Sequence, residues 1–182
     1  MKPAPRPAIA ASLVAASILL VGCAPDKSKE PPPCPRISIL SDTVKMVRFR
    51  SGPGRDITDV ELEAEISSYK GSCAYDLDKR TMDIELKVGI DARLGPAAKA
   101  RAADLAYFVA IPFYYPKPEA KRLMPVALSF AQNNDHVRYI DDVLSISFAV
   151  PDLKNLDKYD VILGLQLDAD QLEYNRRQAT TR

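Results

Sequence analysis

The chain has 182 residues, of which 47% are hydrophobic and 27% are charged, and its formal net charge is +1. This length and composition suit one globular domain with a hydrophobic core. Residues 1–22 carry Lys2 and Arg6 and no acid, so without them the 25 basic residues become 23, against 24 acidic ones. A near-neutral domain with scattered basic residues lacks the positive surface that binds phosphate backbones. Nucleic acid is therefore discounted as a partner.

Residues 1–22 have the order of a signal peptide: two basic residues, an apolar stretch over 8–21, and Leu20-Val21-Gly22-Cys23 at the end. These last four residues resemble the bacterial lipobox, in which a Leu-like residue and two small or aliphatic residues precede a lipidated cysteine. The resemblance implies cleavage before Cys23 and attachment to the membrane through acyl chains on Cys23. A transmembrane anchor is the alternative, but about 14 apolar residues fall short of the roughly 20 that span a bilayer.

The residues after Cys23 bear on location and reach. Ala24 stands where many inner-membrane lipoproteins of Gram-negative bacteria carry Asp, so the resemblance implies the periplasmic face of the outer membrane. Residues 23–35 are rich in proline and charged side chains, a composition that resists packing and favours extended geometry. We interpret them as a tether, followed by a folded domain over residues 36–177 and a disordered tail over residues 178–182.

Two further cysteines, Cys34 and Cys73, remain once Cys23 carries lipid. Export to an oxidising compartment predicts a disulfide between them. A redox or metal pair is the alternative, but there is no CxxC spacing and no histidine near either cysteine in the sequence. The bond would fasten the end of the tether to the domain, and closure of a loop of about 40 residues contributes roughly 3 to 4 kcal/mol.

Alternation of apolar and polar residues predicts strands through most of the domain. One or two strands are expected in 37–49, and single strands in 60–66, 82–90, 105–115, 126–131, 143–150 and 159–167. Residues 69–76 predict a turn that contains Cys73 and joins two of these strands as an antiparallel pair. Pro112 indicates an edge position or a bulge. Helical signals are short: 96–104 is Ala-rich, and Asp168 is placed to cap a turn that reaches Tyr174.

About seven short strands without a long helix predict an all-β, antiparallel two-sheet sandwich of the immunoglobulin-like type, with short helical turns. Residues 156–161 resemble the tyrosine corner of such sandwiches through Tyr159, although an ordinary packed tyrosine explains the same residue. The chain also resembles uncharacterised proteobacterial envelope lipoproteins in residues 93–97, 107–111 and 171–176. That resemblance implies no particular activity.

The sequence offers little for catalysis. His136 is the only histidine, so a Ser-His-Asp or Cys-His arrangement would have to use it, and it lies beside an apparent turn. HExxH, GxSxG and phosphate-binding glycine motifs are absent from the sequence. We predict no enzyme activity, no cofactor and no metal. Carboxylates that suit calcium occur at Glu61, Glu63, Glu65, Asp141, Asp142, Asp168 and Asp170, but a solvated strand surface is the simpler interpretation.

Consecutive aromatic residues between prolines mark a candidate recognition loop. Its contact residues are Phe113, Tyr114, Tyr115 and Lys117, because tyrosine is favoured at interfaces. The alternative is a strand end packed on the core, in which Phe113 and Tyr115 continue the inward parity and Tyr114 is the exposed residue. We predict a membrane-attached protein that binds another envelope protein as an accessory or assembly subunit. The alternative is a module that binds a glycan or small ligand, which clustered surface tyrosines would indicate.

Overall fold

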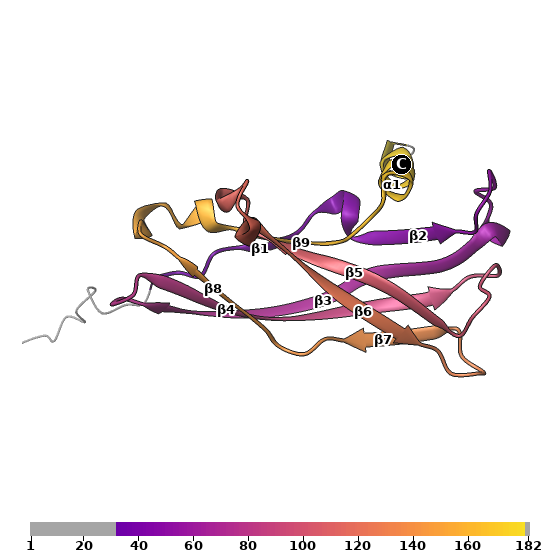
Figure 1. Cartoon of the computed structure of the whole chain (residues 1–182), viewed down its shortest axis with the longest axis horizontal. Helices are drawn as coiled ribbons and strands as arrows, with labels where there is room; N and C mark the ends of the chain where they lie inside the picture. Colours follow the sequence, from indigo (N-terminus) through magenta and orange to yellow (C-terminus); the bar gives the residue numbers. More distant parts are fainter. Residues whose placement is uncertain (1–31, 181–182) are drawn as a thin grey trace, which may run out of the picture. The chain divides into compact units, whose positions relative to one another are not determined.

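The computed structural model describes residues 32–180, which form two β-sheets (Figure 1). The first sheet has the order β1-β9-β5-β6, comprising β1 (Ile37–Ile39), β9 (Val161–Leu165), β5 (Ala102–Ala110) and β6 (Lys121–Ser129). Strand β1 runs parallel to β9, whereas β5 is antiparallel to both β9 and β6. Strands β1 and β6 are therefore the two edges of this sheet.

The second sheet is antiparallel throughout and contains β2 (Lys45–Phe49), β3 (Val60–Asp76), β4 (Thr81–Leu94), β7 (His136–Ile140) and β8 (Leu144–Ala149). Both β7 and β8 pair with β4: β7 lies along its C-terminal half and β8 along its N-terminal half. Residues 141–143 interrupt what would otherwise be one long edge strand. This interruption places the acidic residues Asp141 and Asp142 between β7 and β8.

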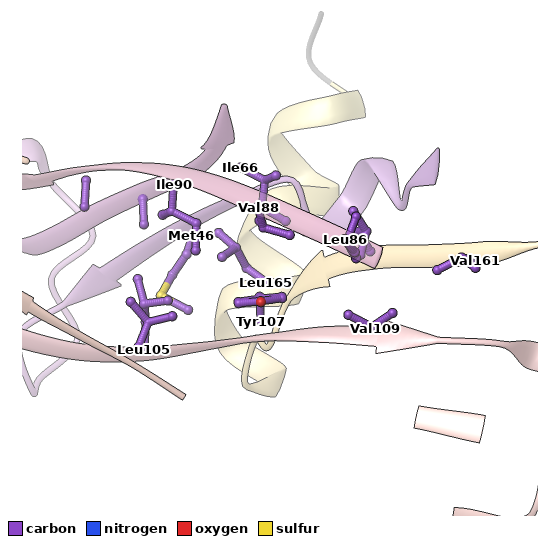
Figure 2. Close-up of a cluster of buried hydrophobic side chains, with 14 of the residues drawn as sticks. Met46, Ile66, Leu86, Val88, Ile90, Leu105, Tyr107, Val109, Val161 and Leu165 are labelled. Atoms are coloured by element: carbon purple, nitrogen blue, oxygen red, sulfur yellow. The ribbon is translucent and has the colours of Figure 1, made fainter. Parts of the chain in front are cut away.

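Side chains from both sheets meet in one hydrophobic core (Figure 2). The second sheet contributes a run of alternate residues from β4, namely Met82, Ile84, Leu86, Val88, Ile90, Ala92 and Leu94. The first sheet contributes Leu105, Tyr107 and Val109 of β5 with Val161, Leu163 and Leu165 of β9. Burial of these apolar groups is the main favourable term for folding. The period-two alternation in the sequence therefore identified the inward faces of the central strands.

Short helices connect the strands, and one longer helix follows the last strand. The short ones are η2 (Ser41–Thr43), η3 (Ile57–Asp59), η4 (Pro112–Tyr114), η5 (Pro118–Ala120) and η6 (Leu153–Tyr159). Helix α1 (Ala169–Thr180) begins with a capping box, because the Asp168 carboxylate accepts from the Gln171 N–H and the Gln171 side chain accepts from the Asp168 N–H. Asn175 fastens the helix by donating to the backbone carbonyls of Asp42 and Lys45.

The two-sheet sandwich that the sequence predicts is present, but it is not antiparallel throughout, because β1 runs parallel to β9. Several local predictions were also wrong. Nine strands lie within residues 32–180 rather than about seven, because β7 was missed and 37–49, where one or two strands were expected, contains two. Residues 96–104 form a turn and the start of β5 rather than a helix, since pairing with β6 outweighs the weak helical preference of alanine. Helix α1 extends to Thr180, so residues 178–180 are helical rather than part of a disordered tail.

The expected turn at residues 69–76 is the second half of β3. Pairing continues from Tyr69 opposite Val88 to Asp76 opposite Thr81, and the turn lies at residues 77–80. Arg80 there has a positive φ of 54°, and the Asp76 carboxylate accepts from the backbone N–H groups of Asp78 and Lys79. Glycine and serine in a strand edge were therefore mistaken for turn residues.

Candidate functional site

A groove opens along one side of the sandwich, between the edge strand β6 of the first sheet and the edge strand β8 of the second. Its volume is about 350 Å³, and it is lined by Ile111, which follows β5, and by residues of β5, η5, β6 and β8, among them Glu119, Arg122, Ile146 and Phe148. The floor is apolar, because Ile111 and Phe148 belong to the buried core. We call this feature the lateral groove.

The groove contains a charged side chain that faces inward. Arg122 lies opposite Val109 in the β5–β6 register, and Val109 is a buried core residue. Residues directly opposite each other share a face of the sheet, so Arg122 points toward the space between the sheets. Its guanidinium donates to the Ser145 carbonyl oxygen at 3.5 Å, and no carboxylate within residues 32–180 forms an ion pair with it.

One wall of the groove is the free edge of β8. Val150 continues β8 and donates its N–H to the Arg80 carbonyl. Every second residue of β8, counted back from Val150, therefore forms its backbone hydrogen bonds with β4. Hydrogen bonding alternates along an antiparallel strand. The backbone groups of Ser145, Ser147 and Ala149 therefore point away from β4, toward the groove.

The candidate recognition loop, residues 112–117, is called the aromatic loop from here on. It borders the groove, since it connects Ile111 to Pro118, both of which line the groove. Tyr115 is 82% exposed and Phe113 is 49% exposed, whereas Tyr114 is half-buried. The prediction that Tyr114 is the exposed aromatic was wrong. Strand β5 ends at Ala110 and the 3₁₀ helix η4 follows, so the period-two parity of a strand no longer applies.

Tyr114 closes one end of the β8 edge. Its hydroxyl donates to the Ala149 carbonyl oxygen, and its ring lies 6.1 Å from that of Phe148 and 6.3 Å from that of Tyr159. The Phe113 ring lies 4.8 Å from the Tyr159 ring. Burial raises the pKa of the Tyr114 phenol. Aromatic packing thus fixes the base of the loop and leaves Tyr115 and Lys117 at its surface.

A polar cluster between the two sheets was not predicted from the sequence. Asp141, in the break between β7 and β8, accepts from the Tyr107 hydroxyl at 2.6 Å and from the Tyr139 hydroxyl at 2.8 Å. Burial first, and then the hydrogen bond to Asp141, raises the pKa of Tyr107, and the same causes raise the pKa of Tyr139 to about 12. The cluster joins the two sheets, and the sequence signal for it was an acidic pair between two apolar segments.

The expected disulfide joins Cys34 to Cys73, which are 39 positions apart in the sequence. Cys73 lies within β3 rather than in a turn. The Tyr69 hydroxyl donates to the carbonyl of Ile37, the first residue of β1, at 2.9 Å, so β1 and the segment before it are each attached to β3. Cys23, the expected signal peptide and most of the expected tether lie outside the described residues.

The other acidic candidates lie apart from the groove. Glu65 pairs with Lys45 at 3.3 Å, and Glu63 lies opposite Arg93 on the outward face of β3. Hydrogen bonds from Arg138 hold the pKa of the neighbouring Asp91 carboxyl below its usual value. His136 is exposed and lies opposite Arg93. This face carries alternating charges across four strands, which is typical of a solvated sheet surface.

Within residues 32–180, no three His, Cys, Asp or Glu side chains are grouped closely enough to hold a metal ion. The helices of the same part of the chain include none with the length and apolarity that a membrane span requires. No protein-family model, curated protein or solved structure matches the chain.

Proposed function

We propose that this chain is a periplasmic lipoprotein of the outer membrane, and that its sandwich domain binds another protein of the cell envelope as an accessory or assembly subunit. The observation that carries the proposal is the exposure of Tyr115 and Phe113 beside the apolar lateral groove. Exposed aromatic residues next to a groove are typical of protein-binding surfaces. The contact residues are Phe113, Tyr115 and Lys117, and Tyr114 fixes the loop from behind.

The membrane attachment follows from the lipobox resemblance. Acylation of Cys23 after removal of residues 1–22 attaches the protein, and residues 24–33 separate the lipid from the disulfide at Cys34. A Cys34–Cys73 bond is in keeping with an oxidising compartment. Cys23→Ser in cells is expected to move the protein from the membrane fraction to the soluble fraction; retention in the membrane would contradict the lipid anchor.

The proposed role is binding rather than catalysis, in keeping with the position of His136. His136 lies on the open outward face of the second sheet, where its neighbours are charged residues such as Arg93 and Glu63. A glycan or small ligand is the second candidate occupant, because the volume of the lateral groove, about 350 Å³, lies at the lower end of the range for small-molecule sites. The exposed tyrosine beside it is a surface on which such a ligand can stack.

The immunoglobulin-like type of the sandwich stays a prediction. Tyr159, which resembles a tyrosine corner, is buried just before β9. Burial raises the pKa of its phenol, while a hydrogen bond with the backbone of Asp152 lowers it. One observation does not fit this type. Strand β9 lies between β1 and β5, whereas the last strand of an immunoglobulin-like sandwich lies beside the strand that precedes it in the sequence.

Crosslinking in living cells followed by affinity capture tests the proposed function. Wild type is compared with the double variant Phe113→Ala and Tyr115→Ala, and with Lys87→Ala on an exposed position of β4 as control. We expect a stoichiometric envelope protein with wild type and with the control, and its loss from the double variant. Equal capture by all three, or no partner above background, would overturn the proposal for this surface.

A further inference from the structure

The free edge of β8 and the lateral groove beside it suggest a mode of binding, which rests on the proposed function. We propose that the groove takes an extended segment of a partner protein. The segment adds as a strand to the β8 edge and places an acidic side chain against Arg122. Strand addition of this kind uses backbone hydrogen bonds for affinity and side-chain pockets for specificity.

Side chains of Tyr114 and Arg122 reach the two ends of the β8 edge, but within residues 32–180 its middle, around Ser147, lacks the features by which proteins usually block a sheet edge. Such features include lysine, proline, bulges, very short strands and covering segments. The edge strand β6 contains Pro125. The outer edge of β3 beyond its bulge is attached to the segment before β1 through Cys73 and to β1 itself through Tyr69. Strand β8 reads Leu-Ser-Ile-Ser-Phe-Ala, without charge or proline.

The backbone groups on this edge define where a strand would pair. The carbonyl of Ser145 accepts from Arg122, and the carbonyl of Ala149 accepts from Tyr114. Ser147, between them, points its N–H and carbonyl outward by the alternation of the β4–β8 ladder. A partner strand centred on Ser147 would thus pair between two side chains that mark its ends.

The chemistry of the segment follows from the lining. Ile111, Ile146 and Phe148 form an apolar surface between the sheets, which suits apolar side chains at alternate positions of the added strand. Arg122 faces this space without an ion-pair partner among residues 32–180. A guanidinium there favours a carboxylate, which it can bind with two parallel hydrogen bonds.

Selection from a library of random linear peptides displayed on phage tests this binding mode on the mature protein. We expect selected peptides to combine apolar residues at alternate positions with an acid. Their affinity should fall about tenfold for Arg122→Glu, whereas Lys87→Glu, which makes the same charge change on the outward face of β4, should leave it unchanged. A tenfold loss corresponds to about 1.4 kcal/mol.

Backbone pairing has its own test. Ser147→Pro removes an N–H that points away from β4, a position where an edge strand tolerates proline. This substitution should lower the affinity for the selected peptides as strongly as Arg122→Glu does. Hydrogen exchange on the wild-type protein provides the same answer if that variant fails to fold, because the Ser147 amide should become protected when peptide binds. No enriched peptide, or peptides that bind Arg122→Glu as tightly as wild type without protecting Ser147, would overturn the inference.

The two proposals fail separately. If Arg122→Glu and Ser147→Pro leave the envelope protein captured in cells while the loss of Phe113 and Tyr115 releases it, the loop binds a partner and strand addition is wrong. If the peptides bind as expected but no envelope protein is captured, the groove binds extended chains and the envelope role is wrong.

Discussion

The hydroxyl of Tyr107 donates to the carboxylate of Asp141 at 2.6 Å, and this bond joins β5 of one sheet to the break between β7 and β8 of the other. Tyr107 is 0% exposed, so its hydroxyl would be buried without a partner if the bond were lost. A polar group left unsatisfied in a core costs about 1 to 3 kcal/mol. The bond therefore helps to fix how the two sheets meet.

Tyr107→Phe removes the hydroxyl and leaves Asp141 with one donor fewer. We expect the free energy of unfolding to fall by about 1 to 2 kcal/mol, measured by urea denaturation. Tyr115→Phe is the matched control, because Tyr115 is 82% exposed and should show no measurable change. Equal stability of wild type and Tyr107→Phe would mean that the bond between the sheets contributes nothing.

Tyr139 has a raised pKa, which leads us to expect that the free energy of unfolding falls at alkaline pH. Its pKa is raised from 10.0 to about 12, first by burial and then by its hydrogen bond to Asp141. Below pH 10 the phenol is protonated in both states, so its contribution is complete. As the pH rises from 10 to about 12, the unfolded state ionises before the folded state and this contribution is lost. The slope of stability against pH should be shallower for Tyr139→Phe, by at most about 1.4 kcal/mol per pH unit, and identical slopes would contradict the assignment.

Two glycines should respond differently to a methyl group. A Cβ at Gly164 would lie 2.0 Å from the Thr43 hydroxyl oxygen and 2.6 Å from the Phe108 ring, and neither group can withdraw easily. A Cβ at Gly71 would meet the end of the flexible Ile37 side chain. Thermal unfolding should show Gly164→Ala to be destabilised by about 1 to 3 kcal/mol, and Gly71→Ala by clearly less. The reverse order would refute this account of close packing over β9.

Loss of the disulfide should lower stability and release β1 first. Cys34→Ser combined with Cys73→Ser is expected to cost roughly 3 to 4 kcal/mol in the chain-entropy description of the unfolded state. Strand β1 has only three residues. Without the disulfide it is held by the pairing with β9 and by the hydrogen bond from Tyr69 to Ile37. Hydrogen exchange should accelerate at β1 before β4; uniform acceleration across both strands would disagree with this order.

The inward faces of the central strands could be predicted from the sequence because burial of one face imposes strict alternation. Residues 82–90 are the clear case, where every second residue of β4 is in the core. The second half of β3 was missed because Ser67, Ser68, Gly71 and Ser72 carry turn chemistry but lie in an exposed strand. Pairing with β4 decides their conformation, and pairing between distant segments is not encoded locally.

The candidate site was predicted only in part. The aromatic loop and the pairing of Cys34 with Cys73 were identified from residue types and compartment. Arg122 and the free edge of β8 were not, although Arg122 has the inward parity of Val126 and Leu128. Which strand of the second sheet lies across from β6 depends on the topology of the sandwich. Because β7 was missed, the sequence did not show that β7 and β8 together form the edge of the second sheet beside β4.

Site-specific photocrosslinking in living cells shows whether the lateral groove and the aromatic loop contact another protein. A photoreactive amino acid is placed at Tyr115, beside the lateral groove, and at Lys87, on the outward face of β4. We expect one envelope protein to be crosslinked from position 115 and not from position 87, and Arg122→Glu to reduce the yield of that crosslink. Crosslinks of equal yield from both positions, or from neither, would contradict a protein-binding surface at the groove.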